Sequence, residues 1–417
     1  MRIGILVIVF LGWFTANAQQ ITNIKVQENN RTKTSFVLNL VTTQTGSSLD
    51  SVQLQKDVDQ LKRLAGVSHA YYQVETNTDG TCTVIYGVQD NFTLLPQLNV
   101  YTTNDDEFAF RLGLYEYNLF GRNIAVGGFY QDDIYGSFGL NFRAPNLFSR
   151  KFGLALNFQD LTTQEPVFLT QGTADYRYNN TSYEIQGLYQ LNFNHKFALG
   201  FSFFNEDYQY LNGATESSVP QQFNVDKLLF KGIYEYSNVA FYYQYRDGFK
   251  SMLNLQYVRS SDGILPDFVI GWNDAIYYTR VGSSGNWASR LRLGLASNDD
   301  SPFAPFAVDN NLNIRGVGNT IDRGTGVIVL NTEYRHTLID KDWFVLQSNV
   351  FVDSGTWRNP GGDFGDFGDS QNLRVYPGVG VRLIHKRIFN AVFRIDYGFG
   401  ITEDATNGFV FGIGQYF

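Results

Sequence analysis

The stretch FVFGIGQYF, residues 409–417, decides the fold. Its side chains alternate along an extended strand, with Phe409, Phe411, Ile413 and Phe417 on one side and Val410, Gly412, Gly414 and Tyr416 on the other. An alternating strand with an aromatic end is typical of an outer-membrane β-barrel, in which closure removes the sheet edge that hydrocarbon cannot solvate. We therefore predict a closing strand whose lipid-facing residues are Phe409, Phe411 and Phe417.

The first 18 residues have the layout of a secretory signal peptide. Arg2 gives a basic start, residues 3–14 form an apolar run too short to span a bilayer, and Ala16-Asn17-Ala18 is a small-residue cleavage site. The single cysteine, Cys82, lies far from that site, so we expect neither a lipid anchor there nor a disulfide framework. The expected mature chain begins at Gln19 and acts in the bacterial outer membrane.

Composition supports a membrane barrel. The chain has 36 Phe, 26 Tyr and 40 Gly but only 2 Met, and its aromatic content of 16% accompanies a slightly negative mean hydropathy. Transmembrane strands need an apolar residue only at every second position, so such a chain can be embedded without a long apolar run. The net charge of −8 argues against nucleic acid as a partner, because nucleic-acid binding needs a concentrated basic surface.

Residues 19–90 predict a small domain of their own. A short strand near Ile21 and a brief apolar segment at 34–41 precede an amphipathic helix over Leu49–Leu64, whose apolar face carries Val52, Leu54, Val58, Leu61 and Leu64. Strands at Ala70–Val74 and Thr83–Val88 follow, separated by an Asp79-Gly80 turn. The order strand, helix, helix, strand, strand defines a small α+β domain, and any unrelated domain of this class fits the pattern.

Residues 91–417 predict a barrel of about sixteen antiparallel strands. In residues 290–295, arginines point to one side and leucines to the other, as a polar lumen and a lipid face require. Short connections at 118–122, 146–150, 192–195 and 336–342 alternate with longer polar loops at 159–175, 302–325 and 355–372. The segment 227–260 fits either two strands or three. The expected fold is thus an all-β transmembrane barrel preceded by a small α+β periplasmic domain.

Several motifs resemble one known superfamily. Residues 46–75 resemble a POTRA domain, with Asp57, Leu61, Leu64 and Gly66, followed by the Ala70–Val74 strand, matching that family's second helix and second strand. The barrel resembles the BamA, TamA and FhaC superfamily of outer-membrane assembly and translocation proteins. The motifs that carry the resemblance occur in the family's order: NLFGRN at 118–123, PNLFSRK at 145–151, NIRGVG at 313–318, VFVDSG at 350–355, and GVGVRL followed by FRIDYG at 393–398.

The resemblance implies a lock between a loop and the barrel wall. Alternation places Asp353 on the lumen side together with Phe351, and the guanidinium of Arg315 offers a planar fork that can hold a carboxylate. By spacing alone, Arg315 fits a solvated loop residue and Asp353 an isolated lumen charge. The family motifs favour a lock formed by Arg315, Gly316 and Asp353.

No catalytic or cofactor constellation is visible in the sequence. The four histidines are scattered singly, the acidic stretch 361–369 lacks the terminal glutamate of an EF-hand and is expected to be a flexible outer loop, and no G-x-S-x-G elbow occurs. We expect no metal, no cofactor and no enzymatic activity.

The predicted function is assembly or translocation of client proteins by a specialised or accessory member. The expected partners are the outer-membrane lipid bilayer, an unfolded client polypeptide in the periplasm, and accessory periplasmic proteins. The client would dock by strand addition at the edge of the Ala70–Val74 strand, around Tyr72. The alternative is a transport or binding barrel, such as a pore, a receptor or a lipid transporter, without insertase activity.

Overall fold

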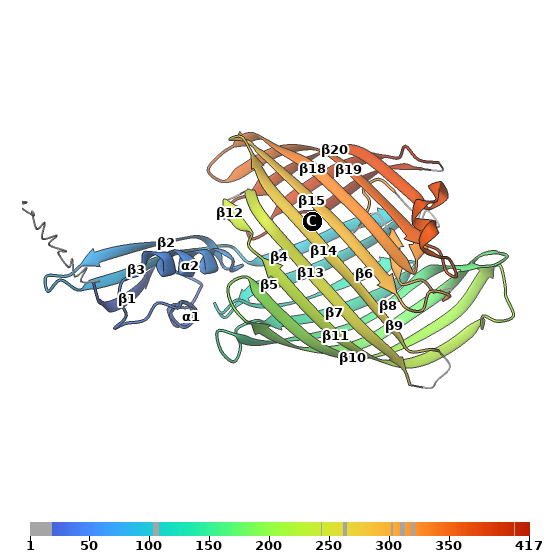
Figure 1. Ribbon diagram of the computed structural model, residues 1–417, viewed down its shortest axis with the longest axis horizontal. Helices are drawn as coiled ribbons and strands as arrows, with labels where there is room; N and C mark the ends of the chain where they lie inside the picture. Colours follow the sequence, from blue (N-terminus) through green and yellow to red (C-terminus); the bar gives the residue numbers. More distant parts are fainter. Residues whose placement is uncertain are drawn as a thin grey trace, which may run out of the picture.

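The computed structural model describes residues 19–102, 108–242, 244–261, 265–301, 303–308, 313–317, 322–403 and 405–417. Two parts follow each other along its long axis, a small N-terminal domain and a large β-barrel (Figure 1). The predicted signal peptide lies outside the described residues. Within them, no helix is long and apolar enough to cross a bilayer.

The N-terminal domain has the predicted order of elements. These are β1 (Ile21–Gln27), α1 (Thr34–Leu40), α2 (Ser51–Lys62), β2 (Val67–Thr76) and β3 (Cys82–Asp90). The sheet order is β1-β3-β2, with β1 parallel and β2 antiparallel to the central strand β3. Strand β2 is therefore an edge of this sheet.

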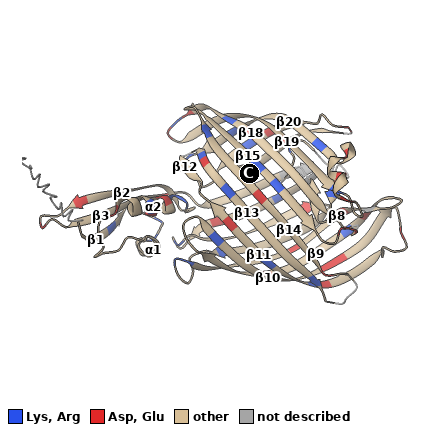
Figure 2. Cartoon of the chain, viewed as in Figure 1, with Lys and Arg blue, Asp and Glu red and all other residues tan. Residues whose placement is uncertain are grey.

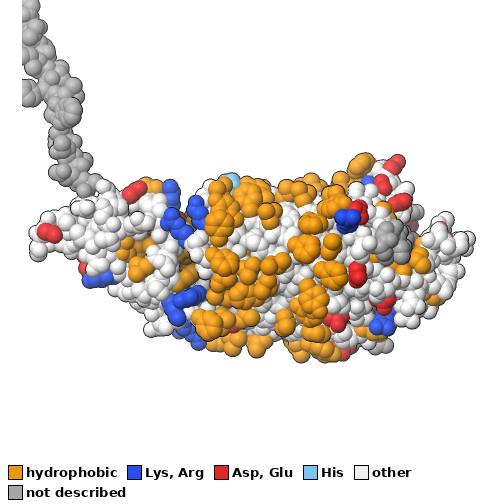
Figure 3. Space-filling view, turned by 90° about the horizontal axis from the view of Figure 1, so that it is seen from below, with side chains coloured by type: hydrophobic (Ala, Val, Ile, Leu, Met, Phe, Trp, Pro, Cys, Tyr) orange, Lys and Arg blue, Asp and Glu red, His pale blue; other side chains and the backbone are white. Residues whose placement is uncertain are grey.

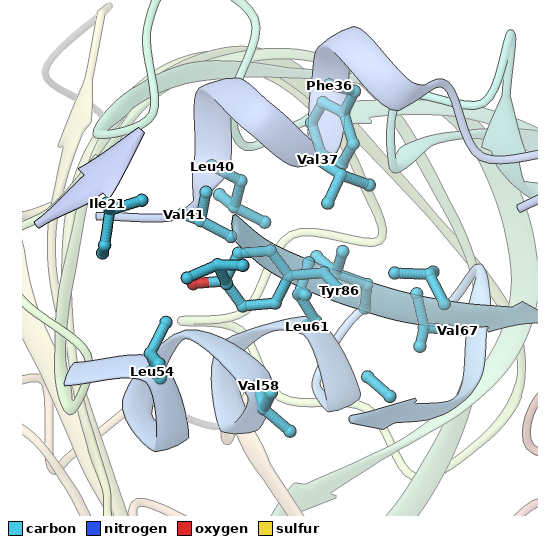
Figure 4. Close-up of a cluster of buried hydrophobic side chains, with 14 of the residues drawn as sticks. Ile21, Phe36, Val37, Leu40, Val41, Leu54, Val58, Leu61, Val67 and Tyr86 are labelled. Atoms are coloured by element: carbon cyan, nitrogen blue, oxygen red, sulfur yellow. The ribbon is translucent and has the colours of Figure 1, made fainter. Parts of the chain in front are cut away.

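The two helices pack on one face of the sheet (Figure 4). Asp50 begins α2, because its carboxylate accepts hydrogen bonds from the backbone N–H groups of Val52 and Gln53. Leu54, Val58 and Leu61 of α2 are buried as predicted. Val52 is 61% exposed, so its predicted place in the core is wrong: it lies in the first turn, beside the cap.

The barrel has sixteen full-length strands. Seventeen strands follow each other in the closed ring, but β12 has only three residues and lies beside β13 at one end. The strands are β4 (Leu94–Thr102), β5 (Phe108–Leu119), β6 (Ile124–Asp133), β7 (Tyr135–Ala144), β8 (Phe152–Leu169), β9 (Gly172–Gln190), β10 (His195–Gly213), β11 (Gln222–Ser237), β12 (Ala240–Tyr242), β13 (Tyr245–Ser260), β14 (Phe268–Val281), β15 (Gly285–Ala296), β18 (Gly326–Asp340), β19 (Phe344–Arg358), β20 (Leu373–His385), β21 (Val392–Phe399) and β22 (Asn407–Ile413). The segment 227–260 therefore contributes two barrel strands and one short piece.

Several predicted connections differ from the structure. The predicted loop 159–175 is wrong, since β8 and β9 continue to a tight hairpin at residues 170–171. These strand ends are polar because a sheet beyond the apolar belt can pair polar side chains across strands, as Asn179 does with Asp160 and Thr162. Strand β18 likewise runs to Asp340, into the predicted turn at 336–342.

Two of the predicted long loops contain regular structure among their described residues. Residues 306–308 (β16) and 322–324 (β17) pair within the loop predicted at 302–325. The stretch 361–369, expected to be a flexible loop, contains the 3₁₀ turn η1 (Phe364–Gly368), and η2 (Ser370–Asn372) follows it. The side chains of Asp363 and Asp369 cap these two turns.

The barrel wall has an apolar outer face and a polar inner face. Leu291 and Leu293 are exposed on the outside, whereas Arg290, next to Leu291 in the same strand, is 4% exposed and points inward. Apolar side chains cover much of the outer surface (Figure 3), and charged residues lie along the strands as well as in the loops (Figure 2). The alternation thus separates a lipid-facing belt from a charged lumen.

Two of the three residues predicted for the closing strand lie on its outer face. Phe409 and Phe411 are 61% and 49% exposed on the outer face of β22, which neighbours β4 in the ring. The prediction for Phe417 is wrong, because the strand ends at Ile413 and Gly414, with φ of +99°, turns the chain inward. The Phe417 ring packs beside buried wall residues of the lumen, and the guanidinium of Arg290 lies over it at 5.6 Å.

Candidate functional site

Arg315 and Asp353, the residues of the predicted loop lock, are in contact in the lumen. The guanidinium of Arg315 donates two parallel hydrogen bonds to the carboxylate of Asp353 in β19, from Nε at 2.8 Å and from a terminal nitrogen at 2.9 Å. The backbone N–H of Arg315 donates a third, at 3.0 Å. Both side chains are 0% exposed. Such a bidentate, fully buried ion pair holds the loop tip against the wall with defined geometry.

The lock contains more groups than the sequence indicated. Arg315 also donates to Glu333 of β18 at 2.7 Å, and its guanidinium lies 3.7 Å from Asp396 of β21 and 3.7 Å from the centre of the Phe351 ring. One arginine therefore reaches three carboxylates on three different strands. Asp396 lies in the FRIDYG motif, but the motif did not indicate that it meets Arg315; for Glu333 the inward position in an alternating strand is the only signal.

Further arginines complete the buried network. Arg335 and Arg382 pair with Glu333, and Arg394 pairs with Asp396 at 3.0 Å. Glu333 and Asp396 thus keep cationic partners besides Arg315. Among the ion pairs that the described residues form, Asp353 takes part only in the pair with Arg315. Removal of Arg315 should therefore be unfavourable mainly because it leaves the Asp353 carboxylate buried without a cationic partner.

Gly316 allows the loop tip to approach the wall closely. Its φ is +98°, and a Cβ placed there would lie 2.6 Å from the Cα of Gly398 in β21. A Cβ on Gly398 would in turn lie 2.1 Å from the carbonyl oxygen of Arg315. Both positions need glycine because no space remains for a side chain, and the positive φ of Gly316 favours glycine there as well. The predicted role of Gly316 is consistent with this contact.

The residues around the lock are well packed. Val317 is 0% exposed, and its carbonyl accepts a hydrogen bond from the hydroxyl of Thr406 at 2.7 Å. Asn313 accepts a hydrogen bond from Arg292 at 3.2 Å and donates one to the carbonyl of Ala307. The β16–β17 pair lies beside this tip, and its Phe306 and Val308 share a buried apolar cluster with Val317. The described part of the loop therefore fills the lumen as a folded unit.

The inward-turned residues after β22 contact the same arginines. The Tyr416 ring lies 4.7 Å from the guanidinium of Arg315 and 4.8 Å from that of Arg394. Aromatic faces attract guanidinium groups, and the attraction strengthens where water is excluded. The loop tip and the chain end thus meet at one arginine cluster in the lumen.

The N-terminal domain is attached to one end of the barrel, which we call the domain-proximal rim. The backbone N–H of Lys33 donates to the carbonyl of Gly121, and Asn118 donates to the hydroxyl of Thr32, so the NLFGRN turn is a docking contact. Arg63, the residue after α2, donates to the carbonyls of Phe193 and Val239 in two other barrel connections. The sequence motif indicated the turn but not this contact.

Tyr72 lies in β2 and is half-buried against the core of the domain. Its strand pairs with β3 on one side only, so the other edge of β2 is open within the described sheet. The structure places Tyr72 on an edge strand and does not bring it to the lock.

No group of three or more His, Cys, Asp or Glu side chains able to hold a metal ion occurs among the described residues. The acidic groups of the site are instead paired with arginines.

The sequence matches no protein-family model, and no curated protein gives a significant match. Solved structures do match. BamA from Haemophilus ducreyi, in a crystal structure lacking POTRA domains 1–3, is 15% identical, with a TM-score of 0.55, covering 95% of this chain and 84% of that chain. CdiB from Acinetobacter baumannii is 14% identical with a TM-score of 0.60, and CdiB from Escherichia coli is 9% identical with a TM-score of 0.64; each covers 95% of this chain, and 74% and 77% of their own chains respectively.

These likenesses show the fold, a sixteen-stranded barrel of the BamA and CdiB type, which is the architecture of bacterial outer-membrane proteins. The resemblance expected from the sequence motifs is thereby confirmed at the level of the fold.

Proposed function

We propose that the protein assembles client polypeptides into the outer membrane or translocates them across it, as a specialised or accessory barrel of this type. The observation that carries the proposal is that two features occur together: a loop held inside the lumen by the Arg315 lock, and an N-terminal domain docked on the barrel. The Arg315 lock keeps a folded loop inside the barrel, which does not suit a permanently open pore. The domain offers an open strand edge next to the barrel mouth.

In this proposal the N-terminal domain lies in the periplasm and receives the client. An extended chain adds to the β2 edge, because an unpaired edge presents a row of free backbone donors and acceptors. The client then reaches the barrel, where the first and last strands, β4 and β22, separate to admit it. We propose that residues 19–90 form a POTRA-type module, since the order of elements and the docked position suit that role.

Depletion of the protein in cells tests the proposal against the alternative of a transport or binding barrel. Selective loss of one or more proteins from the outer-membrane or surface proteome is the expected result. Unchanged protein levels, together with altered uptake or altered lipid composition, would favour a pore, a receptor or a lipid transporter instead.

A matched pair of proline variants tests the docking edge. Neighbouring residues of a strand direct their N–H groups to opposite edges, so of Tyr72 and Gln73 one donates toward β3 and the other toward the open edge. Proline on the open-edge side should abolish a crosslink between β2 and the client without unfolding the domain, whereas the other proline should destabilise the sheet. Equal crosslinking in wild type and both folded variants would argue against β2 as the docking site.

A further inference from the structure

A cavity of about 630 Å³ lies between the N-terminal domain and the domain-proximal rim. It is lined by the end of α2 and the start of β2, by the connection that contains β12, and by the turn between β20 and β21. Its size falls within the range of about 300–1,000 Å³ that is usual for binding sites. Figure 3 shows Lys and Arg side chains gathered along this border between the domain and the apolar belt.

The cavity is lined by basic groups. Its ionisable lining residues are Lys62, Arg63, His69, Arg246, His385 and Lys386, and no Asp or Glu occurs among the described residues that line it. This composition is unusual in a chain whose net charge is −8. A cavity with one sign of charge concentrates ligands of the opposite sign.

Acidic groups near the cavity neutralise only part of this charge. Glu235 acts electrostatically on Arg63, but it is itself paired with Lys196 and Lys250. Asp59 lies 3.9 Å from Lys62, and the exposed Asp340 pairs with Lys386. The guanidinium of Arg246 forms no ion pair among the described residues; it donates to the hydroxyl of Tyr278 at 3.2 Å and lies over an aromatic ring. Burial lowers the pKa of Arg63, whose donors go to backbone carbonyls. An anionic ligand would relieve this surplus of positive charge.

The cavity connects the docking edge with the lumen. Val67, Ser68 and His69 at the start of β2 line it from the domain side. Val345 and Val392 line it from the inner face of the barrel wall, where both are buried. The cavity therefore borders both the start of β2 and the inner face of the barrel wall.

We propose that this cavity binds an acidic segment of the client polypeptide between the β2 edge and the lumen. The inference rests on the proposed function, because it names the chemistry of the client. A polypeptide suits the cavity better than a membrane lipid does, since its walls include inward-facing barrel residues. Of the exposed aromatic side chains at this rim, Phe241 and Tyr242 line the cavity, whereas Phe120 and Phe148, each 70% exposed, do not.

Peptide binding to the full-length protein in detergent tests this proposal. The probe is a fluorescent peptide of alternating glutamate and serine, compared with its glutamine–serine counterpart by fluorescence anisotropy at low and high salt. The variant pairs Lys62→Glu with Arg246→Glu. The matched control pairs Lys56→Glu with Lys341→Glu, two exposed residues outside the cavity that change the net charge equally. If the cavity variant with Lys62→Glu and Arg246→Glu fails to fold, a variant with Lys62→Gln and Arg246→Gln replaces it.

The expected result is salt-sensitive binding of the acidic peptide that the cavity variant weakens at least about tenfold and the control leaves unchanged. Equal binding of the two peptides by wild type, or an equal loss in variant and control, would overturn the proposal. Displacement of the peptide by glycerol phosphate at the same concentration would overturn it too, in favour of a lipid headgroup site.

These outcomes are separable from a failure of the proposed function. Peptide binding is measured on purified protein, whereas the proposed function is judged from the surface proteome after depletion. Retained peptide binding with an unchanged proteome would reject the function alone, and a changed proteome without peptide binding would reject the acidic client alone.

Discussion

Removal of Arg315 should release the loop from the lumen wall. In Arg315→Ala, Asp353 stays buried without its bidentate partner, whereas Glu333 and Asp396 keep other arginines. Breaking a buried ion pair by deleting one partner costs about 3–5 kcal/mol. Since each 1.4 kcal/mol is about a tenfold change in an equilibrium, the population of the released loop should rise roughly 100-fold to several-thousand-fold.

Cysteine accessibility measures this release directly. Val317 is 0% exposed, and Cys82 is the single cysteine of the chain, so Val317→Cys in a Cys82→Ser background places one thiol under the locked tip. A membrane-impermeant maleimide should label it slowly with Arg315 present and far faster in Arg315→Ala. Arg315→Lys, which keeps the charge but loses the planar fork, should give an intermediate rate.

Two comparisons make the result specific. Lys231→Ala breaks the pair between Lys231 and Glu184, which joins β11 to β9 away from the loop, and should leave the labelling rate unchanged. In a double-mutant cycle, Arg315→Ala with Asp353→Ala should cost less than the sum of the single changes. The reasoning is refuted if Arg315→Ala, shown to be folded by heat-modifiable gel migration, labels at the wild-type rate.

Three further changes test other parts of the structure. Phe409→Asp, on the lipid-facing side of β22, should block membrane insertion, whereas Phe417→Asp, which meets arginines in the lumen, should still give a heat-modifiable barrel. Gly316→Ala should speed labelling of the loop tip because its Cβ meets the backbone of β21, while Gly368→Ala, with open space around it, should not. Asp57→Ala should destabilise the N-terminal domain by about 2–4 kcal/mol, seen as faster proteolysis of that domain alone, since it leaves several buried donors unpaired.

The sequence was informative for features that depend on the residue types along a single strand or within a single motif. Alternation identified the barrel strands, and the pairing of Arg315 with Asp353 followed once the superfamily motifs were in register. If the lock consisted of the Arg315–Asp353 pair alone, exchanging the two residues should restore the lock. The structure predicts failure of that exchange, because an aspartate at position 315 would face Glu333 and Asp396.

The parts that could not be predicted depend on long-range geometry. Glu333 lies in a strand that has no distinctive local pattern, and Asp396 lies in the FRIDYG motif, which does not by itself indicate an ion pair. Only closure of the ring brings both residues to Arg315. Phe417 fits the alternation of a lipid-facing strand, but Gly414 turns the chain before the pattern is completed. The long hairpin of β8 and β9 was hidden because polar strand ends and polar loops have the same composition.

Unequal strand lengths give the barrel wall an uneven height. Strands β9 and β10 have 19 residues each, whereas β21 has 8 and β22 has 7. At about 3.3 Å per residue, β22 extends about 23 Å along its own axis, and its tilt shortens the vertical span further. A bilayer must match this height, so the lipid layer should thin and its acyl chains should pack less regularly along the β22 side. The membrane itself is thereby weakest beside the junction of the first and last strands.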